Sequence, residues 1–135
     1  MRIAIVSAPA ARGEIPDYIK GLAKGMESMG HRVDILDAWV EDGMKLPGYE
    51  YVAVVTEPLS FFSGKIIPNI TKMLSAGSSL LGKKGAAFVK KKGLFTNRAF
   101  ANLMRDMEKE GMRINWSDIL LNEPHAQAIG KRIGT

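Results

Sequence analysis

The sequence predicts an α/β fold in which helices cover both faces of a five-stranded parallel sheet. Short apolar runs alternate along the chain with segments that repeat apolar residues every three or four positions. No low-complexity linker and no internal repeat interrupts this alternation. Strands and helices that alternate in this way form parallel sheets with right-handed crossovers. We therefore expect a three-layer sandwich and a single domain over residues 1–135.

Five segments have the composition of strands. Residues 3–6 are apolar throughout, which is typical of a strand that is covered on both faces. The segment 51–56 contains three valines and is expected at the centre of the sheet. The expected strands are residues 3–6, 33–36, 51–56, 85–89 and 114–121.

Segments with helical periodicity separate most of these strands. The strongest pattern lies in residues 98–110, and Gly111 follows it at the usual position after a helix. The polar segment 38–48, between the second and third strands, has room for one short helix. The expected helices are residues 15–29, 67–76 and 98–110, with a short terminal helix that begins at Pro124.

The composition limits the chemistry that the chain can perform. There is no cysteine, which excludes disulfides, thiolate catalysis and metal centres bound by cysteine. No apolar stretch approaches the about 18 residues that span a bilayer, and the apolar start is too short for a signal peptide. We expect a cytoplasmic protein with no membrane partner. The net charge of +5 favours anionic ligands or acidic proteins, whereas nucleic acid is not an expected partner.

Four segments follow the carboxyl ends of the expected strands. In open parallel sheets, ligands bind beyond these ends, where the strand order reverses. Candidate binding residues are therefore sought in residues 7–16, 56–64, 90–97 and 121–124.

Several motifs follow one another in a familiar order. The first strand reads MRIAIVSA, and the first helix runs into the second strand as GMESMGHRVDILD. The third strand and its loop read LPGYEYVAVVTEPLSFFSGKI, and the fourth strand follows in LLGKKGAAFV. NRAFANLMRDMEKEGMRI covers the next helix and the start of the fifth strand. In this order and spacing the chain resembles the flavodoxin family over nearly its whole length, which implies the flavodoxin-like strand order 2-1-3-4-5.

The resemblance implies a flavin and a place for it. It implies non-covalent binding of FMN and redox chemistry, as an electron carrier or as an FMN-dependent oxidoreductase. The loop after the first strand would wrap the 5′-phosphate, and the loops after the third and fourth strands would enclose the isoalloxazine ring. The residues at the phosphate end are then Ser7, Ala8, Arg12 and Gly13. Those at the ring end are then Pro58, Leu59, Phe61, Phe62, Gly93, Phe95, Thr96 and Asn97.

The phosphate loop is poor in hydrogen-bond donors. Ser7 is its one hydroxyl, and Pro9 and Pro16 each lack a backbone N–H. Glu14 adds a carboxylate that Arg12 offsets only in part. Loss of two hydroxyl bonds to a charged phosphate, at about 1.5–3 kcal/mol each, would weaken binding by about two to four decades. The sequence therefore predicts a degenerate phosphate loop.

A second hypothesis belongs to a different class of function. Five lysines flank the fourth strand, so a cofactor-free module with this fold could bind or assemble with an acidic partner through them. The scarcity of hydroxyls in the loop after the first strand favours this hypothesis, while the aromatic residues after the third and fourth strands favour flavin binding. The sequence leaves both hypotheses open. It also leaves open a homodimer. The five residues are Lys83, Lys84, Lys90, Lys91 and Lys92.

Overall fold

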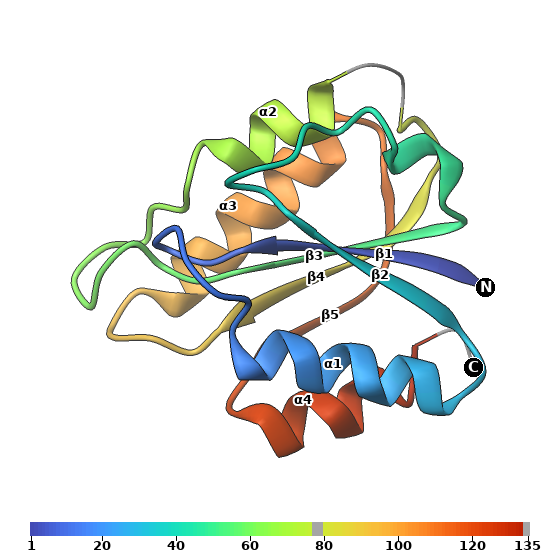
Figure 1. The fold of residues 1–135 in the computed structure, drawn as a ribbon. Helices are drawn as coiled ribbons and strands as arrows, with labels where there is room; N and C mark the ends of the chain where they lie inside the picture. The colour runs from blue at the N-terminus through green and yellow to red at the C-terminus, as the bar shows by residue number, and fades with distance from the viewer. Residues whose placement is uncertain (77–79, 134–135) are drawn as a thin grey trace.

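The computed structural model describes residues 1–76 and 80–133 and confirms the predicted sheet. Five parallel strands pair in the order β2-β1-β3-β4-β5, as the resemblance implies (Figure 1). The central position expected of the segment 51–56 is confirmed, since β3 lies between β1 and β4. The strands are β1 (Arg2–Ala8), β2 (Arg32–Asp37), β3 (Tyr51–Thr56), β4 (Lys84–Lys90) and β5 (Arg113–Leu120).

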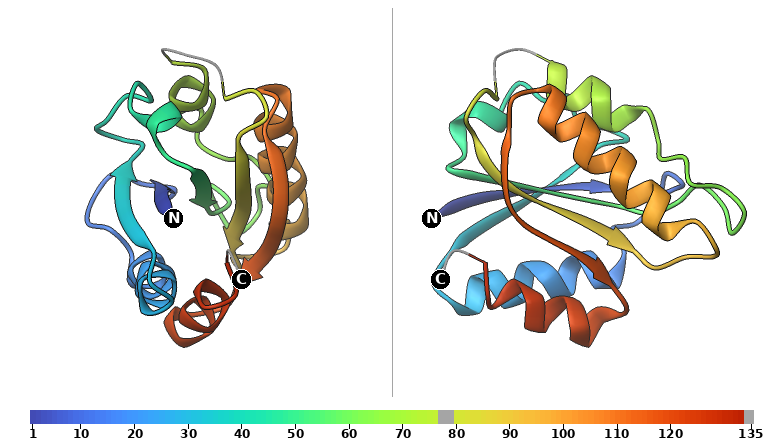
Figure 2. Two further views of the ribbon diagram at one scale, coloured as in Figure 1. Left: turned by 90° about the vertical axis from the view of Figure 1, so that its right-hand side faces the viewer. Right: turned by 180° about the vertical axis from the view of Figure 1, so that it is seen from behind.

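Helices cover both faces of the sheet. The pair α1 and α4 lies side by side on one face, and α2 and α3 lie on the other, as the views in Figure 1 and Figure 2 show. The long connection between β2 and β3 contains one turn of 3-10 helix, η1 (Leu46–Gly48). The helices are α1 (Asp17–Ser28), α2 (Asn69–Ser75), α3 (Thr96–Lys109) and α4 (Glu123–Gly130).

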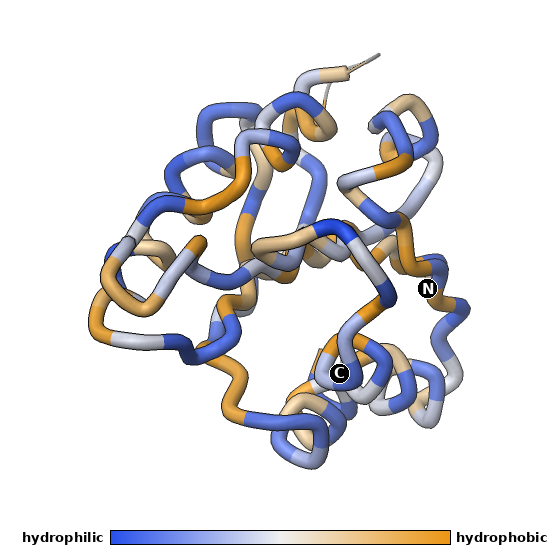
Figure 3. The backbone as a smooth tube through the Cα atoms, turned by 60° about the vertical axis from the view of Figure 1, so that its left-hand side comes forward, coloured by the Kyte–Doolittle hydropathy of each residue, from blue (hydrophilic) through white to orange (hydrophobic). Residues whose placement is uncertain are grey.

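Each face of the sheet has its own hydrophobic core. Ile5 and Phe88 point from the sheet toward α1 and α4, whereas Val54 points toward α2 and α3; all three are fully buried. Hydrophobic and hydrophilic residues alternate along the helices, as the tube in Figure 3 shows. This alternation is what a helix needs in order to cover one face of a sheet and expose its other side to water.

All four helices begin one or two residues away from the sequence-based boundaries, and the hydrogen bonds explain two of these differences. The first was expected from residue 15 but starts at Asp17, because Pro16 is extended, with a ψ of 150°, and its carbonyl accepts the first helical hydrogen bonds. The helix α3 starts at Thr96, two positions earlier than expected, because the hydroxyl of Thr96 bonds the backbone of Lys92 and closes the turn before the helix. Both changes lie at the carboxyl edge of the sheet.

The helices α1 and α4 approach each other closely through glycines. A Cβ atom placed on Gly25 of α1 would lie 2.1 Å from the carbonyl oxygen of Gln127 in α4. A Cβ atom on Gly130 of α4 would lie 2.4 Å from the carbonyl oxygen of Leu22 in α1. No side chain fits at either position without moving a backbone, so this packing requires both glycines.

His31 joins the two ends of the described chain. Its Nε2 atom lies 3.1 Å from the carbonyl oxygen of Ile133, and its Nδ1 atom lies 3.1 Å from the terminal nitrogen of Met1. A carbonyl can only accept, so Nε2 carries the proton and Nδ1 accepts from the ammonium group. All three residues lie at the edge where the strands begin, opposite the edge where they end (Figure 1).

Candidate functional site

The predicted phosphate end begins inside the sheet. Ser7 and Ala8 are residues of β1 and are fully buried, and the hydroxyl of Ser7 has no hydrogen-bond partner among the described residues. The carbonyl of Ala8 accepts a hydrogen bond of 2.6 Å from the hydroxyl of Thr56. Arg12 and Gly13 lie further along the loop and are exposed. Only these last two therefore face solvent.

A carboxylate from the neighbouring loop contacts this one. Glu57 follows directly after β3, and its Oε1 atom accepts a hydrogen bond of 3.3 Å from the backbone N–H of Ala10. Its Oε2 atom lies 3.5 Å from the ammonium nitrogen of Lys92, which follows β4. We refer to these contacts of Glu57 with Ala10 and Lys92 as the Glu57 bridge. It connects the loops after β1, β3 and β4.

Tyr18, in the first turn of α1, lies beside the Glu57 bridge. The ammonium nitrogen of Lys90 is 5.8 Å from the centre of its ring. Burial, and secondly the negative charge of Glu57, raise the pKa of the Tyr18 hydroxyl. This hydroxyl is also buried and has no partner among the residues that the structure describes. Two buried hydroxyls at this edge, those of Ser7 and Tyr18, therefore have no partner among the described residues.

Tyrosine ionisation is expected to lower the stability of the fold at alkaline pH. Burial is the main cause that raises the pKa values of Tyr18 and Tyr51 above the ordinary value of about 10. Above that pH an unfolded chain loses protons that the folded chain retains, so stability is full below about pH 10 and falls as the pH rises further. Tyrosinate absorbance and urea unfolding across this range measure the effect. Unfolding midpoints that stay constant well above the ordinary pKa would contradict it.

The loop after β3 presents two aromatic side chains at its tip. Pro58 is buried at its base, where the backbone N–H of Leu59 donates a hydrogen bond of 3.0 Å to the carbonyl of Lys65 and closes the loop. At the tip, Phe61 is 62% exposed and Phe62 is 79% exposed. Both rings are therefore free to contact a ligand or a partner.

The loops after β3 and β4 touch through their backbones. The N–H of Leu94 donates a hydrogen bond of 3.0 Å to the carbonyl oxygen of Phe61. Gly93 has a φ of +68°, and a Cβ atom there would lie 2.2 Å from the same oxygen, so the contact requires glycine. Beside it, Phe95 is 37% exposed, and the guanidinium of Arg98 lies 5.4 Å from the centre of its ring. The structure therefore brings the three predicted aromatic residues to adjoining loops.

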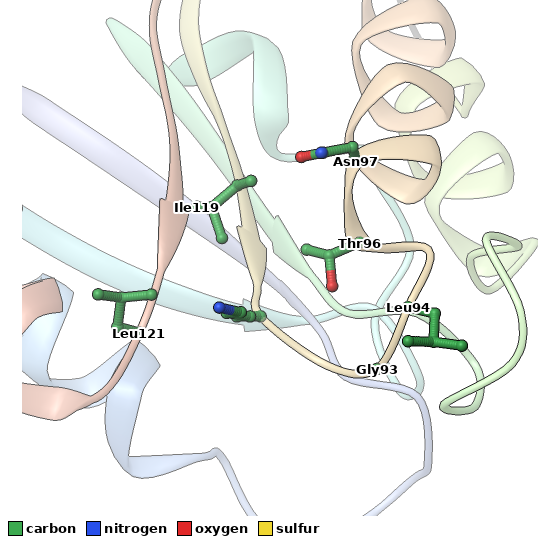
Figure 4. Close-up of a pocket in the computed structure, with 7 residues that line it drawn as sticks. Gly93, Leu94, Thr96, Asn97, Ile119 and Leu121 are labelled. Atoms are coloured by element: carbon green, nitrogen blue, oxygen red, sulfur yellow. The ribbon is translucent and has the colours of Figure 1, made fainter.

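A pocket of about 410 Å³ lies on the other side of the loop after β4. Figure 4 shows it between this loop, the start of α3 and the end of β5. Of the predicted residues, it brings together Gly93, Thr96 and Asn97, but none from the loops after β1 and β3. The sequence did not single out Leu94 and Leu121, which line it and are more than half exposed. Exposed apolar residues after a strand could have indicated them.

The five lysines around β4 separate into two groups. Lys83 and Lys84 lie at the start of the strand, and residues 90–92 lie at its end. Lys83 donates hydrogen bonds to the carbonyls of Pro47, at 3.1 Å, and of Tyr49, at 2.6 Å, so it holds the connection between β2 and β3 in place. Because β4 lies between β3 and β5, the lysines form two separate basic regions at opposite ends of an inner strand.

Two further properties hold for the part of the chain that the structure describes. Within residues 1–76 and 80–133, no three histidine, aspartate or glutamate side chains gather where they could hold a metal ion. No helix in these ranges has the length and apolar character needed to cross a membrane.

The strand order and the placement of the helices define a flavodoxin-like fold. Comparison with solved structures gives matches over almost the whole chain at low sequence identity. Oxidised flavodoxin 1 from Bacillus cereus matches with a TM-score of 0.73 and 12% identity, over 96% of this chain and 95% of that chain. A flavodoxin from the domain Archaea matches with a TM-score of 0.71 and 18% identity, over 98% of this chain and 96% of that chain. Two-electron reduced flavodoxin from Megasphaera elsdenii matches with a TM-score of 0.68 and 14% identity, over 96% of each chain.

Sequence comparison adds nothing to this likeness. No protein-family model matches the chain, and no curated protein does. The likeness to flavodoxins is therefore one of fold.

The residues at the carboxyl edge suit the two ends of FMN unequally. Phe61 and Phe62 offer exposed aromatic faces of the kind on which an isoalloxazine ring stacks. At the phosphate end, the buried hydroxyl of Ser7 is a donor without a partner, but the N–H of Ala10 already bonds the carboxylate of Glu57. A phosphate there would be repelled by the charge of Glu57, and the N–H of Ala10 would already be bonded. The ring end therefore fits a flavin, and the phosphate end does not.

Proposed function

We propose that this protein binds a flavin at the carboxyl edge of its sheet and takes part in electron transfer. FMN is the cofactor that the resemblance to flavodoxins implies. The ring would contact the exposed side chains of Phe61, Phe62 and Phe95, while Arg12 and Gly13 would lie toward the phosphate end. The observation that carries the proposal is the exposure of these phenylalanines at the edge where ligands bind in such sheets.

The fold of this protein is similar to flavodoxins solved in the oxidised state and in the reduced state, which supports a redox role. The matching structures include an oxidised flavodoxin and a two-electron reduced one. When bound, a flavin would supply the electron-carrying chemistry, and this chain would bind and orient it. The chain's own part would be to stack its aromatic side chains on the ring and shield one side of it from water.

Removal of the exposed rings is expected to weaken flavin binding. We expect the fluorescence of FMN to be quenched when it binds. Phe61→Ala and Phe62→Ala should each raise the dissociation constant of FMN about fivefold, since one stacking contact contributes about 1 kcal/mol. Fluorescence titration of the purified protein measures both values. The matched control is Met29→Ala, an exposed apolar residue at the far end of α1, which should leave binding unchanged.

Two results would count against this proposal. One is the absence of any quenching at high micromolar flavin. The other is binding that does not respond to either phenylalanine, which would place the ligand outside the loop after β3.

The Glu57 bridge favours a second candidate function. A loop amide already bonded to a carboxylate needs no cofactor to satisfy it. The same fold could then act as a cofactor-free module, with its exposed apolar loops and Lys91 toward an acidic partner. The flavin titration decides between the two, because this candidate predicts no quenching by any flavin.

A further inference from the structure

We propose that Glu57 makes the site accept flavins without regard to their 5′-phosphate, so that riboflavin binds at least as tightly as FMN. The inference rests on the flavin-binding function proposed above. It concerns the part of the flavin that the chain recognises, and it assigns to Glu57 the exclusion of a phosphate from the loop after β1.

Both oxygens of the Glu57 carboxylate are engaged. One accepts the N–H of Ala10 at 3.3 Å, and the other lies 3.5 Å from the ammonium nitrogen of Lys92. An N–H and an ammonium group are the partners that a phosphate would also use. The side chains of Glu57 and Lys92 are only 19% and 22% exposed, so water screens their interaction less than it would at an open surface. The carboxylate of Glu57 thus occupies the position at Ala10 and Lys92 that a phosphate would need.

Four other residues of this loop or its ends add little to an anion site. Pro9 and Pro16 have no N–H, and the hydroxyl of Ser7 is fully buried in β1. Arg12 is exposed and offers a charge without a fixed geometry. A phosphate that approaches Ala10 would therefore be repelled by the carboxylate of Glu57 while that group is ionised.

The exposed rings of Phe61 and Phe62 take no part in the Glu57 bridge. Phe61 and Phe62 lie at the tip of the loop, beyond the closure between Leu59 and Lys65, and both rings are exposed. A change at Glu57 should therefore alter the contribution of the phosphate and leave the stacking of the ring intact. Comparison of riboflavin with FMN separates these contributions, because the two differ only by the phosphate.

The experiment is a titration of the wild-type protein and of Glu57→Gln with riboflavin and with FMN. For the wild type we expect the FMN dissociation constant to equal or exceed the riboflavin constant. Glu57→Gln removes the charge at nearly constant shape, and we expect it to tighten FMN about tenfold and riboflavin by less than threefold. Glu57→Ser, which also frees the N–H of Ala10, should act in the same direction. Thermal unfolding verifies that each variant folds.

Glu14→Gln is the matched comparison. It removes the same charge from the loop after β1, but Glu14 is exposed, and the N–H of Ala10 bonds Glu57 instead. We expect it to tighten FMN by less than threefold, because solvent screens an exposed charge. An equal gain from Glu14→Gln and Glu57→Gln would overturn the inference, since net charge alone would then explain it.

A second readout does not use flavin. Inorganic phosphate should shift the NMR signal of the Ala10 amide in Glu57→Ser and leave it unchanged in the wild type. A wild-type protein that binds FMN more tightly than riboflavin, or whose Ala10 amide responds to phosphate, would overturn the inference while the flavin function stands. Absence of binding of either flavin to every variant would overturn the proposed function and this inference with it.

Discussion

Phe88→Ala is expected to lower the free energy of unfolding by about 3–5 kcal/mol, the cost of removing a fully buried aromatic side chain. Phe88 lies in β4, is 0% exposed and packs in the core between the sheet and the helices α1 and α4. Its strand is paired on both sides, so the surrounding backbone has little freedom to close the cavity. Urea unfolding followed by circular dichroism measures the change.

Phe62→Ala is the matched control for this loss. It removes the same side chain from a position that is 79% exposed, and it should change stability by less than about 0.5 kcal/mol. A similar loss from both substitutions would show that Phe62 supports the fold, which would weaken its assignment to ligand binding. A loss below about 1 kcal/mol at Phe88 would contradict its place in the core.

Gly25→Ala is expected to destabilise the protein by about 1–3 kcal/mol, which is the usual cost of overpacking. Alanine favours a helix over glycine by about 1 kcal/mol, so an isolated helix would gain from the change. In the folded protein the new methyl group would lie 2.1 Å from the carbonyl oxygen of Gln127, and α1 and α4 would have to separate. The sign of the effect therefore tests the packing of the two helices.

Gly13→Ala provides the comparison for Gly25→Ala. Gly13 has no positive φ, and no atom lies within 4 Å of the position that its Cβ would take. Its replacement should leave the unfolding midpoint almost unchanged. A gain in stability from Gly25→Ala would mean that α1 and α4 pack less closely than the structure shows.

The fold could be predicted because its signals are local. The apolar runs at residues 3–6 and 51–56 identify strands that are covered on both faces, and the helical periodicity between them requires parallel pairing. The helix boundaries were less accurate. Whether Pro16 or Thr96 lies inside or outside a helix depends on hydrogen bonds of the loop, which periodicity does not report.

From the sequence, only the loops that form the candidate site could be predicted, and not the contacts between them. The loops after the strands were identified, and the exposure of Phe61 and Phe62 follows from the tip of a closed loop. Glu57 was visible as a carboxylate directly after a strand, but its partner Ala10 is 47 residues away in the sequence. The sequence attributed the unfavourable charge to Glu14, whereas the structure shows Glu57 bonded to the loop. Contacts of this kind depend on the register between strands, which composition does not encode.

The contacts of His31 show that a tether near Met1 and one near Ile133 would orient the protein alike on a solid support. Because one imidazole reaches both Met1 and Ile133, a tether attached near either residue holds the molecule by the edge where the strands begin. The phenylalanine loops would then point away from the support, separated from it by a strand length of about 20 Å. On an electrode, such a layer would expose its loops to molecules in solution rather than to the metal. A tether placed at Arg12 instead would turn the same loops toward the electrode.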